Sequence, residues 1–122
     1  MLAQGTTFLV PSGPAEFLHL HVVASGPRAH PDFRLLIPIT SKKAGRFHDP
    51  ACEILAGEHS FITKDSYVLY REIQKRSASK VVACIENGEF VLKDPVSQDL
   101  LTRILAGVGI SDFTAPWVRE FL

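Results

Sequence analysis

The chain reads FRLLIPITS from Phe33 to Ser41, a run in which apolar side chains follow one another almost without interruption. A short run of this kind is typical of a β-strand that is buried on both faces. Pro38 has no backbone N–H to donate, so we expect a bulge or an edge position there. The stretch therefore predicts a buried strand over Phe33–Thr40, with a polar step directly after it.

Two shorter β-prone runs precede this strand. Thr6–Val10 ends at a Pro-Ser-Gly-Pro turn, because the two prolines remove backbone donors. Phe17–Ala24 alternates large apolar residues with histidine, which is close to the period of two expected for a strand. His19 and His21 are therefore expected on the same strand face.

Further short runs follow the polar loop 41–51. Residues 53–55, 57–59 and 60–63 read as short strands joined by a turn, and Ser66–Ile73 reads as a longer one. Many short strands separated by Gly and Pro loops indicate a small barrel or a sandwich. The amino-terminal part of the chain is thus expected to be mainly β.

The pattern becomes helical after Lys75. Ser79 is placed to cap a helix that stops at Asn87-Gly88, although the same Asn-Gly pair also fits a hairpin turn. Asp94 as cap and Pro95 at the first position predict a stronger helix, which ends at Gly107. The last dozen residues are expected to dock as a tail or as a turn of helix.

Length and composition describe an ordinary globular chain. Its 122 residues are enough to bury one core without help from disulfides or metals. The hydrophobic fraction of 46% and the charged fraction of 21% are far from the composition of disordered chains. We expect one domain over residues 1–122, with the strands of a barrel or sandwich in residues 1–75 and a helical part, residues 76–122, packed on them.

The net charge and the length of the apolar runs bear on nucleic-acid binding and on membrane insertion. Thirteen basic and 13 acidic residues give a formal net charge of +0, so any nucleic-acid site must be a local basic patch. The apolar runs fall short of the roughly 20 residues that cross a bilayer, and no signal pattern opens the chain. We therefore expect a cytoplasmic protein without a membrane segment. Cys52 and Cys84 lie outside any CxxC spacing and are expected to be reduced thiols.

Common catalytic motifs are missing from the sequence: it contains no P-loop, GxGxxG, HExxH or GxSxG, so we expect no cofactor. Polar side chains instead gather in the loops on either side of Phe33–Thr40. Before it lie Arg28 and His30, and after it lie Thr40, Ser41, Lys42, Lys43, Arg46, His48 and Asp49.

The second of these loops contains the groups that metal-independent RNA cleavage needs. Such cleavage requires a base, an acid and a cation near the phosphorus. Histidine suits the proton transfers because its pKa lies near 7, and the arginine guanidinium matches phosphate geometry. Arg46 and His48 are candidates for these roles. The alternative is a solvated loop in which Asp49 caps a turn before Pro50.

Several other residues have both a functional and a structural interpretation. His19 and His21, with His48 or His59, suggest a metal site, but no carboxylate or thiolate is placed to complete it, so we expect none. Glu58-His59 is either an acid/base pair or the tip of a hairpin. Tyr67 and Tyr70 are expected on opposite faces of the strand, so at most one of them joins the core and the other is free to stack on a base.

Three features in a fixed order resemble the MazF/PemK family of ribonuclease toxins. The strand ends in Ile39-Thr40-Ser41, the next loop closes with Glu53-Ile54, and Asp65-Ser66 opens a strand that runs to Ile73. The resemblance covers roughly residues 5–85 and depends on spacing more than on rare residue types.

This resemblance implies a small SH3-like β-barrel with C-terminal helices and the activity of a type II endoribonuclease toxin. It implies that Thr40 or Ser41 hydrogen-bonds the scissile phosphate. The chemistry of the loop residues adds Arg46 as the cation and His48 as the proton shuttle. The residues expected to contact RNA are His19, Lys42, Lys43, Tyr70 and Arg71. The expected partners are RNA, a cognate antitoxin and a second copy of the chain.

The sequence departs from the family at one point. The toxins place a catalytic arginine at the start of the second strand, where this chain reads Glu16-Phe17-Leu18-His19. Either His19 or a basic residue from another loop replaces that arginine, or the barrel does not cleave RNA. The alternative function is therefore a catalytically silent barrel that acts as a binding or regulatory module.

Overall fold

A computed structural model describes residues 2–12 and 17–122 of the chain. Its elements, in chain order, are β1 (Thr7–Ser12), β2 (Phe17–Val23), β3 (Phe33–Ser41), β4 (Glu53–Ile54), β5 (Ser66–Val68), the 3₁₀ helix η1 (Tyr70–Glu72), β6 (Gln74–Ser77), α1 (Ala78–Glu86), β7 (Val91–Lys93), α2 (Gln98–Ile110) and α3 (Pro116–Phe121).

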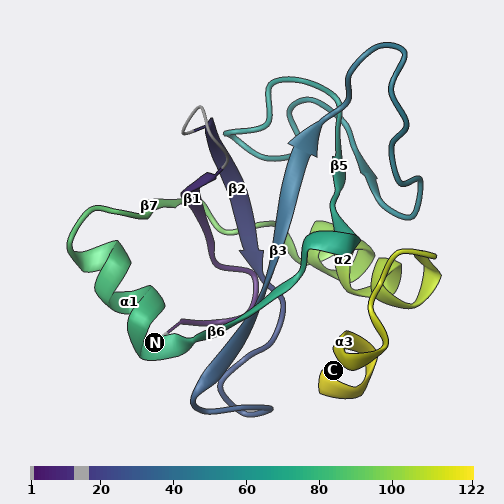
Figure 1. The fold of residues 1–122 in the computed structure, drawn as a ribbon. Coiled ribbons are helices and arrows are strands. Elements are labelled where there is room, and N and C mark those ends of the chain that lie inside the picture. The colour runs from purple at the N-terminus through teal and green to yellow at the C-terminus, as the bar shows by residue number, and fades with distance from the viewer. Residues whose placement is uncertain (1, 13–16) are drawn as a thin grey trace.

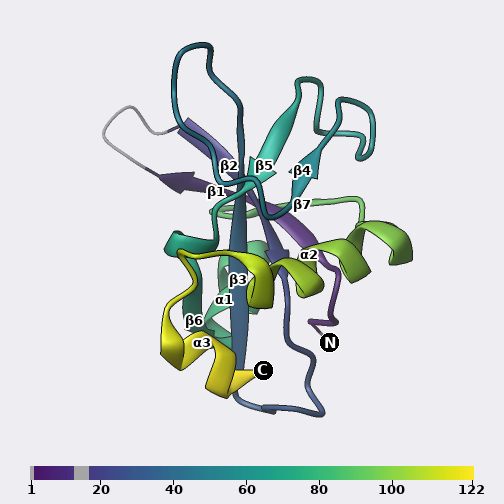
Figure 2. The same ribbon diagram turned by 90° about the vertical axis from the view of Figure 1, so that its right-hand side faces the viewer.

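The strands of the described residues form one antiparallel sheet with the order β4-β5-β3-β2-β1-β7, and β6 pairs with β3 off this path (Figures 1 and 2). The long strand β3 pairs with two partners on one side, with β6 over Phe33–Leu36 and with β5 over Ile39–Ser41. Among the described pairings none joins β4 to β7, so the path of the sheet is open. The prediction of a mainly antiparallel β-fold followed by C-terminal helices is confirmed at this level.

Helices cover both faces of the sheet (Figures 1 and 2). On one face, β3 side chains such as Leu35 and Ile37 pack with Leu100 and Ile104 of α2 and with Val118 of α3. The opposite face carries a second cluster. Its members are Leu2, Phe8, Val10, Val23, Leu36, Val81 of α1 and Phe90. The alternation of side chains along β3 supplies both clusters, which explains the nearly continuous apolar run.

Pro38 does not lie at an edge of the sheet. It falls in the interval of β3 between the β6 ladder, which ends at Leu36, and the β5 ladder, which begins at Ile39. Its carbonyl accepts a hydrogen bond from the backbone N–H of Leu69 at 2.9 Å. A residue without an N–H is tolerated here because β3 changes partner at this point.

The strand predictions differ from the structure in extent at three places. Ser66–Ile73 is not one strand, because the chain leaves the ladder after Val68 and turns through η1, which buries Tyr70. Of the three short strands expected over residues 53–63, the structure forms only β4. β1 continues through Pro11, which lies beyond the part of β1 that pairs with β7 and thus at an edge.

The helix caps also differ from the prediction. The α1 cap is Ser77, whose hydroxyl accepts from Lys80 N–H, and Asn87 ends the helix as expected. The α2 cap is Ser97 and not Asp94. Gly107 does not end α2, which continues to Ile110. This glycine is needed for packing, since a Cβ at this position would lie 1.9 Å from the Tyr70 hydroxyl.

Candidate functional site

The strands β2 and β3 separate toward one end of the sheet (Figure 1). Their ladder runs from Val23 and Leu36 to Leu20 and Ile39 and is not continued beyond these residues. From there β2 stays with β1 while the end of β3 stays with β5. The inner edges of the two strand ends therefore have backbone groups that no ladder uses, and side chains on them border a common space.

This space is a cleft of about 610 Å³. His19 comes from β2, Thr40 and Ser41 come from the end of β3, and Lys43 comes from the loop after it. Residues 60–64 line the cleft from the opposite side. None of the described residues that line it is acidic. The cleft is thus a local basic and hydroxyl-rich site on a chain without net charge, which suits a phosphate backbone.

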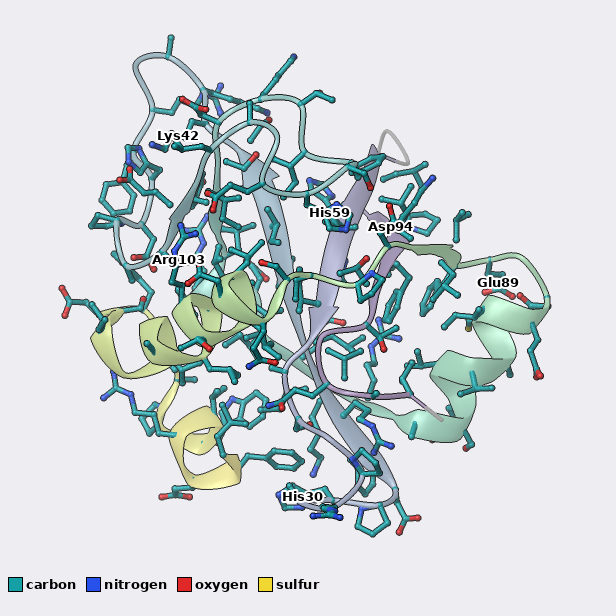
Figure 3. All side chains as sticks on the ribbon, turned by 180° about the vertical axis from the view of Figure 1, so that it is seen from behind. His30, Lys42, His59, Glu89, Asp94 and Arg103 are labelled. Atoms are coloured by element: carbon teal, nitrogen blue, oxygen red, sulfur yellow. The ribbon has the colours of Figure 1, made fainter. Side chains whose placement is uncertain are left out.

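The turn before residues 60–64 is fixed by a buried histidine. His59 is 5% exposed, its Nε2 lies 2.5 Å from the Asp94 carbonyl oxygen, and its Nδ1 accepts from the Phe61 N–H at 3.0 Å (Figure 3). These partners assign the proton to Nε2. The bonds position Phe61, whose ring is 39% exposed at the cleft, while Ser60 donates to the Asp94 carboxylate. Phe61 is therefore held at its backbone and offers a partly exposed aromatic ring to the cleft that Lys43 and Lys64 also line.

Glu58 and His59 are not an acid/base pair, contrary to one interpretation of the sequence. Glu58 forms an ion pair with Arg103 of α2, and the Arg103 side chain also donates to the Glu53 carbonyl at 2.7 Å (Figure 3). The hydrogen bond from Arg103 lowers the pKa of Glu58 below its ordinary value. Both residues of the pair thus hold the 53–61 segment in place, Glu58 against α2 and His59 against Asp94.

A second polar cluster lies on the other side of the β3 end. The Oε1 atom of Glu53 accepts from Lys42 Nζ at 2.7 Å and lies 2.6 Å from His48 Nε2. These two partners, Lys42 first, lower the pKa of the Glu53 carboxyl. The His48 ring lies 5.6 Å from the ring of Tyr67. A carboxylate that holds a histidine by one nitrogen orients the other nitrogen for proton transfer.

The ladders relate this cluster to the cleft. Tyr67 pairs with Thr40 on one side and with Glu53 on the other, so the three side chains share one face of the sheet. Adjacent strands lie about 4.8 Å apart, which places Glu53 about 10 Å from Thr40 across the sheet. His48 and the cleft are therefore neighbouring parts of one surface, with Thr40 at the border.

The remaining predicted residues lie elsewhere. Arg46 is exposed in a tight turn, where its backbone N–H donates to the Lys43 carbonyl at 3.1 Å. Tyr70 is 1% exposed and its hydroxyl donates to the Ile104 carbonyl at 2.7 Å, so its ring belongs to the core and cannot stack on a base. Burial raises the pKa of this phenol. Arg71 is exposed beside a separate small pocket.

Sequence reasoning did not select Phe61, Lys64 or Glu53 as functional residues. Lys64 comes directly before the Asp65-Ser66 step, whose pattern indicates a strand and not a binding site. Glu53 lies at the end of a loop, where its position indicates the start of a strand. Its contact with His48 crosses a turn at Pro50 whose geometry no sequence spacing specifies.

A scan against protein-family models finds no match, and a search of curated proteins finds no significantly similar chain. None of the helices in residues 2–12 and 17–122 combines the length and the apolar character needed to span a bilayer. In the same residues, no three His, Cys, Asp or Glu side chains are grouped so as to hold a metal ion. The geometry of the cleft is thus the basis for a functional proposal.

Proposed function

We propose that this protein is a metal-independent endoribonuclease of the MazF/PemK toxin type, and that it binds single-stranded RNA in the cleft between the ends of β2 and β3. One observation carries the proposal. Four residues selected from the sequence for RNA contact or catalysis, His19, Thr40, Ser41 and Lys43, line the same cleft. They come from two strands and a loop, and no acidic side chain stands among the described lining residues.

The proposal includes an SH3-like barrel, which the resemblance to the MazF/PemK family implies. The support is the behaviour of β3, which pairs with β6 through its first half and with β5 through its second half. A strand shared in this way between two parts of a sheet is expected where a small sheet coils toward a barrel. Strand pairing in the described residues stops short of closure.

The chemistry divides between the cleft and the His48 cluster. A general base takes the proton of the ribose 2′-hydroxyl, the 2′-oxygen attacks phosphorus, and the bond to the 5′-oxygen breaks as a general acid protonates it. In this proposal His48, held by Glu53, and His19 carry the two proton transfers. Thr40, Ser41 and the Lys43 ammonium bind the phosphate and the charge that develops on it.

The partners follow from the same proposal. The cleft that binds RNA would also receive an extended acidic segment of a cognate antitoxin, and two copies of the chain would pair as a homodimer. A cytoplasmic location agrees with both expectations. The cleft lysines supply the positive charge that an acidic segment requires.

The test is incubation of the purified protein with a long unstructured RNA in the presence of a chelator. We expect site-selective cleavage that leaves 2′,3′-cyclic phosphate ends. His48→Ala should lower the rate by about 100-fold or more, the usual contribution of general acid–base catalysis. Lys80→Ala, an exposed lysine on α1, is the matched control and should cleave normally. Intact RNA with a folded wild-type protein would reject the enzymatic function.

A second candidate is a catalytically silent binding module. The specific observation in its favour is the pair of strand edges at the cleft, which offers hydrogen-bonding groups to an extended chain without any chemistry. The engagement of both His48 and Lys42 by Glu53 also agrees with a purely structural loop. This candidate predicts saturable binding of RNA or of a peptide with no turnover in the cleavage assay.

A further inference from the structure

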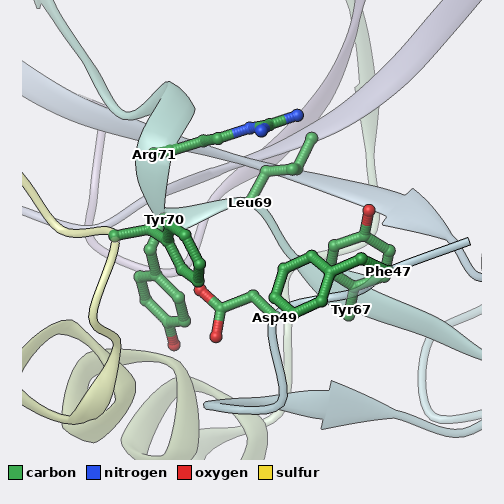
Figure 4. A pocket seen from close by; sticks show the side chains of 7 residues that line it. Phe47, Asp49, Tyr67, Leu69, Tyr70 and Arg71 are labelled. Carbon is green, nitrogen blue, oxygen red and sulfur yellow. The ribbon is translucent and has the colours of Figure 1, made fainter.

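A small pocket is lined by Tyr67 of β5 and by side chains from the loop before β4 and from the segment after β5 (Figure 4). Its walls are mainly aromatic. The lining includes Phe47, Asp49, Tyr67, Arg71 and Phe113. The open space is about 40 Å³, which admits the edge of a planar ring but not a whole ring. A ligand in this pocket therefore keeps most of its surface against the residues at the mouth.

Two exposed aromatic rings flank the mouth. Phe47 is 70% exposed and Phe113 is 44% exposed, and their centroids lie 5.5 Å apart with the rings steeply inclined. Large apolar rings exposed at a pocket are suited to binding a planar partner. Base–aromatic stacking is the usual contact of proteins with unpaired nucleotides, since every base presents a π-face.

Asp49 provides a polar group within these aromatic walls. Its side chain is buried, at 6% exposure, and is held by the Ala51 N–H at 3.0 Å and the Ser111 hydroxyl at 2.5 Å. In Figure 4 its carboxylate lies between the Phe47 ring and Tyr70. An ionised carboxylate has about four acceptor positions, and these contacts use two of them. Within residues 2–12 and 17–122 no further donor reaches this carboxylate, so the other positions remain for a donor that enters the pocket.

Residues that line the pocket and the cleft are paired across adjacent strands. Tyr67 lines the pocket, and its ladder partner Thr40 lines the cleft one strand away. Arg71, whose side chain is 65% exposed, stands at the rim of the pocket. A strand of RNA with a phosphate at Thr40 therefore has a neighbouring base within reach of Phe47 and Asp49.

We propose that this pocket is a base-recognition subsite, in which Phe47 stacks on one unpaired nucleobase and Asp49 accepts a hydrogen bond from its exocyclic amine. The inference rests on the proposed function for the rest of the RNA. A carboxylate accepts from N4 of cytosine, whereas uracil presents the O4 oxygen at the same place. The pocket therefore prefers cytosine to uracil.

The preference is measured with CMP and UMP, separately from any RNA. Nuclear magnetic resonance titrations follow the ring signals of Phe47, Tyr67 and Phe113. We expect CMP to shift these signals and to bind more tightly than UMP. Phe47→Ala should weaken CMP binding about fivefold or more, in line with the loss of one stacked base. Leu55→Ala, which removes another exposed apolar side chain, is the control and should bind normally.

Asp49→Asn tests the origin of the preference, because an amide can donate to O4 of uracil. It should remove or reverse the ratio of CMP to UMP affinity while CMP still shifts the Phe47 ring. Where this variant fails to fold, the wild-type ratio and Phe47→Ala decide the question alone. No shift of the ring signals by CMP, or equal shifts by CMP and UMP, would overturn the subsite, whether or not RNA is cleaved. Shifts with the expected ratio would support it even where RNA stays intact, a result that rejects only the enzymatic function.

Discussion

The two halves of β3 have opposite surroundings. In the first half, Leu35 and Ile37 are completely buried beneath α2 and α3, and Leu36 is buried in the cluster of the opposite face. In the second half, Thr40 and Ser41 are only partly buried and border the cleft. The sequence FRLLIPITS reflects this difference, because its aliphatic side chains are followed by the hydroxyl side chains of Thr40 and Ser41. One strand thus links the part of the molecule that stabilises the fold to the part that is available for binding.

This division predicts where substitutions act. Changes beneath the helices should alter the free energy of unfolding, because close packing there tolerates neither voids nor added volume. Changes at the cleft should alter RNA binding with little effect on stability, since those side chains make few buried contacts. Each prediction below tests one side of the comparison.

Gly107→Ala should have the largest effect. The added Cβ would lie 1.9 Å from the Tyr70 hydroxyl and 2.5 Å from Cζ, so the ring must move and lose its hydrogen bond to Ile104. Overpacking together with a lost buried hydrogen bond should lower the free energy of unfolding by about 3 kcal/mol or more. Urea denaturation followed by circular dichroism measures the change.

Gly109→Ala is the matched control for that substitution. It lies in the same helix, and nothing stands within 4 Å of an added Cβ. The higher helix propensity of alanine should stabilise the protein by about 0.5 to 1 kcal/mol. Equal destabilisation by both variants would show that helix α2, and not the contact with Tyr70, determines the result.

Phe61→Ala should have the next largest effect, on the cleft side of the comparison. Loss of one stacking surface should weaken binding of an unstructured RNA by about 1 to 3 kcal/mol. The free energy of unfolding should change by no more than about 1 kcal/mol, because the ring is partly exposed. The contact that is lost is the one with the Lys93 ammonium, which lies 5.7 Å from the ring centroid. Fluorescence anisotropy measures the RNA affinity, and urea denaturation of the same sample measures the free energy of unfolding. Normal RNA affinity would place the binding surface elsewhere.

Lys43→Ala combined with Lys64→Ala should change the salt dependence of RNA binding. Each lysine that neutralises a phosphate contributes about 0.7 to the slope of log K against log salt for a single strand, so the slope should fall by about 1.4. Binding titrations at several salt concentrations give the slope. Lys80→Ala should leave it unchanged, and an unchanged slope in the double variant would exclude both lysines from phosphate contact.

The smallest effect concerns pH. Arg103 lowers the pKa of Glu58, so this pair stabilises the fold above the ordinary carboxyl pKa of about 4.3, and the contribution is lost as pH falls through the lower folded-state pKa. Both side chains are partly exposed, so the contribution is less than about 1 kcal/mol. The midpoint temperature of thermal unfolding should therefore fall less steeply between pH 7 and pH 3 for Arg103→Gln than for the wild-type protein. Parallel curves would assign no such role to the pair.

Much of the fold was predictable because β3 and its neighbours carry strong local patterns. The period of two in Phe17–Val23 and the aliphatic run of β3 identified both strands. The errors arose where a distant contact overrides a local signal. Glycine commonly ends helices, so the sequence predicts a stop at Gly107. In the structure this position is a glycine inside the helix because a Cβ would collide with Tyr70, which lies far away in the sequence. Aspartate is a common helix N-cap, so the sequence predicts a cap at Asp94. In the structure the Asp94 carbonyl is hydrogen-bonded to His59, and Ser97 caps the helix.

The candidate site was predictable only in part. Thr40, Ser41 and Lys43 are contiguous with a recognisable strand, so their common location follows from the chain itself. The approach of residues 60–64 depends on the buried His59 and on the ion pair of Glu58 with Arg103, and neither contact has a sequence spacing that reveals it. The site was therefore incomplete without the tertiary structure.

The most direct test of this account is a map of backbone amide shifts in the ¹⁵N-labelled protein during titration with a short unstructured RNA. The account predicts shifts in residues 18–20, 39–43 and 60–66, which border the cleft, and none in α1. Shifts centred on α1, or an unchanged spectrum at saturating RNA, would contradict the assignment of the cleft at the second half of β3 as the binding site.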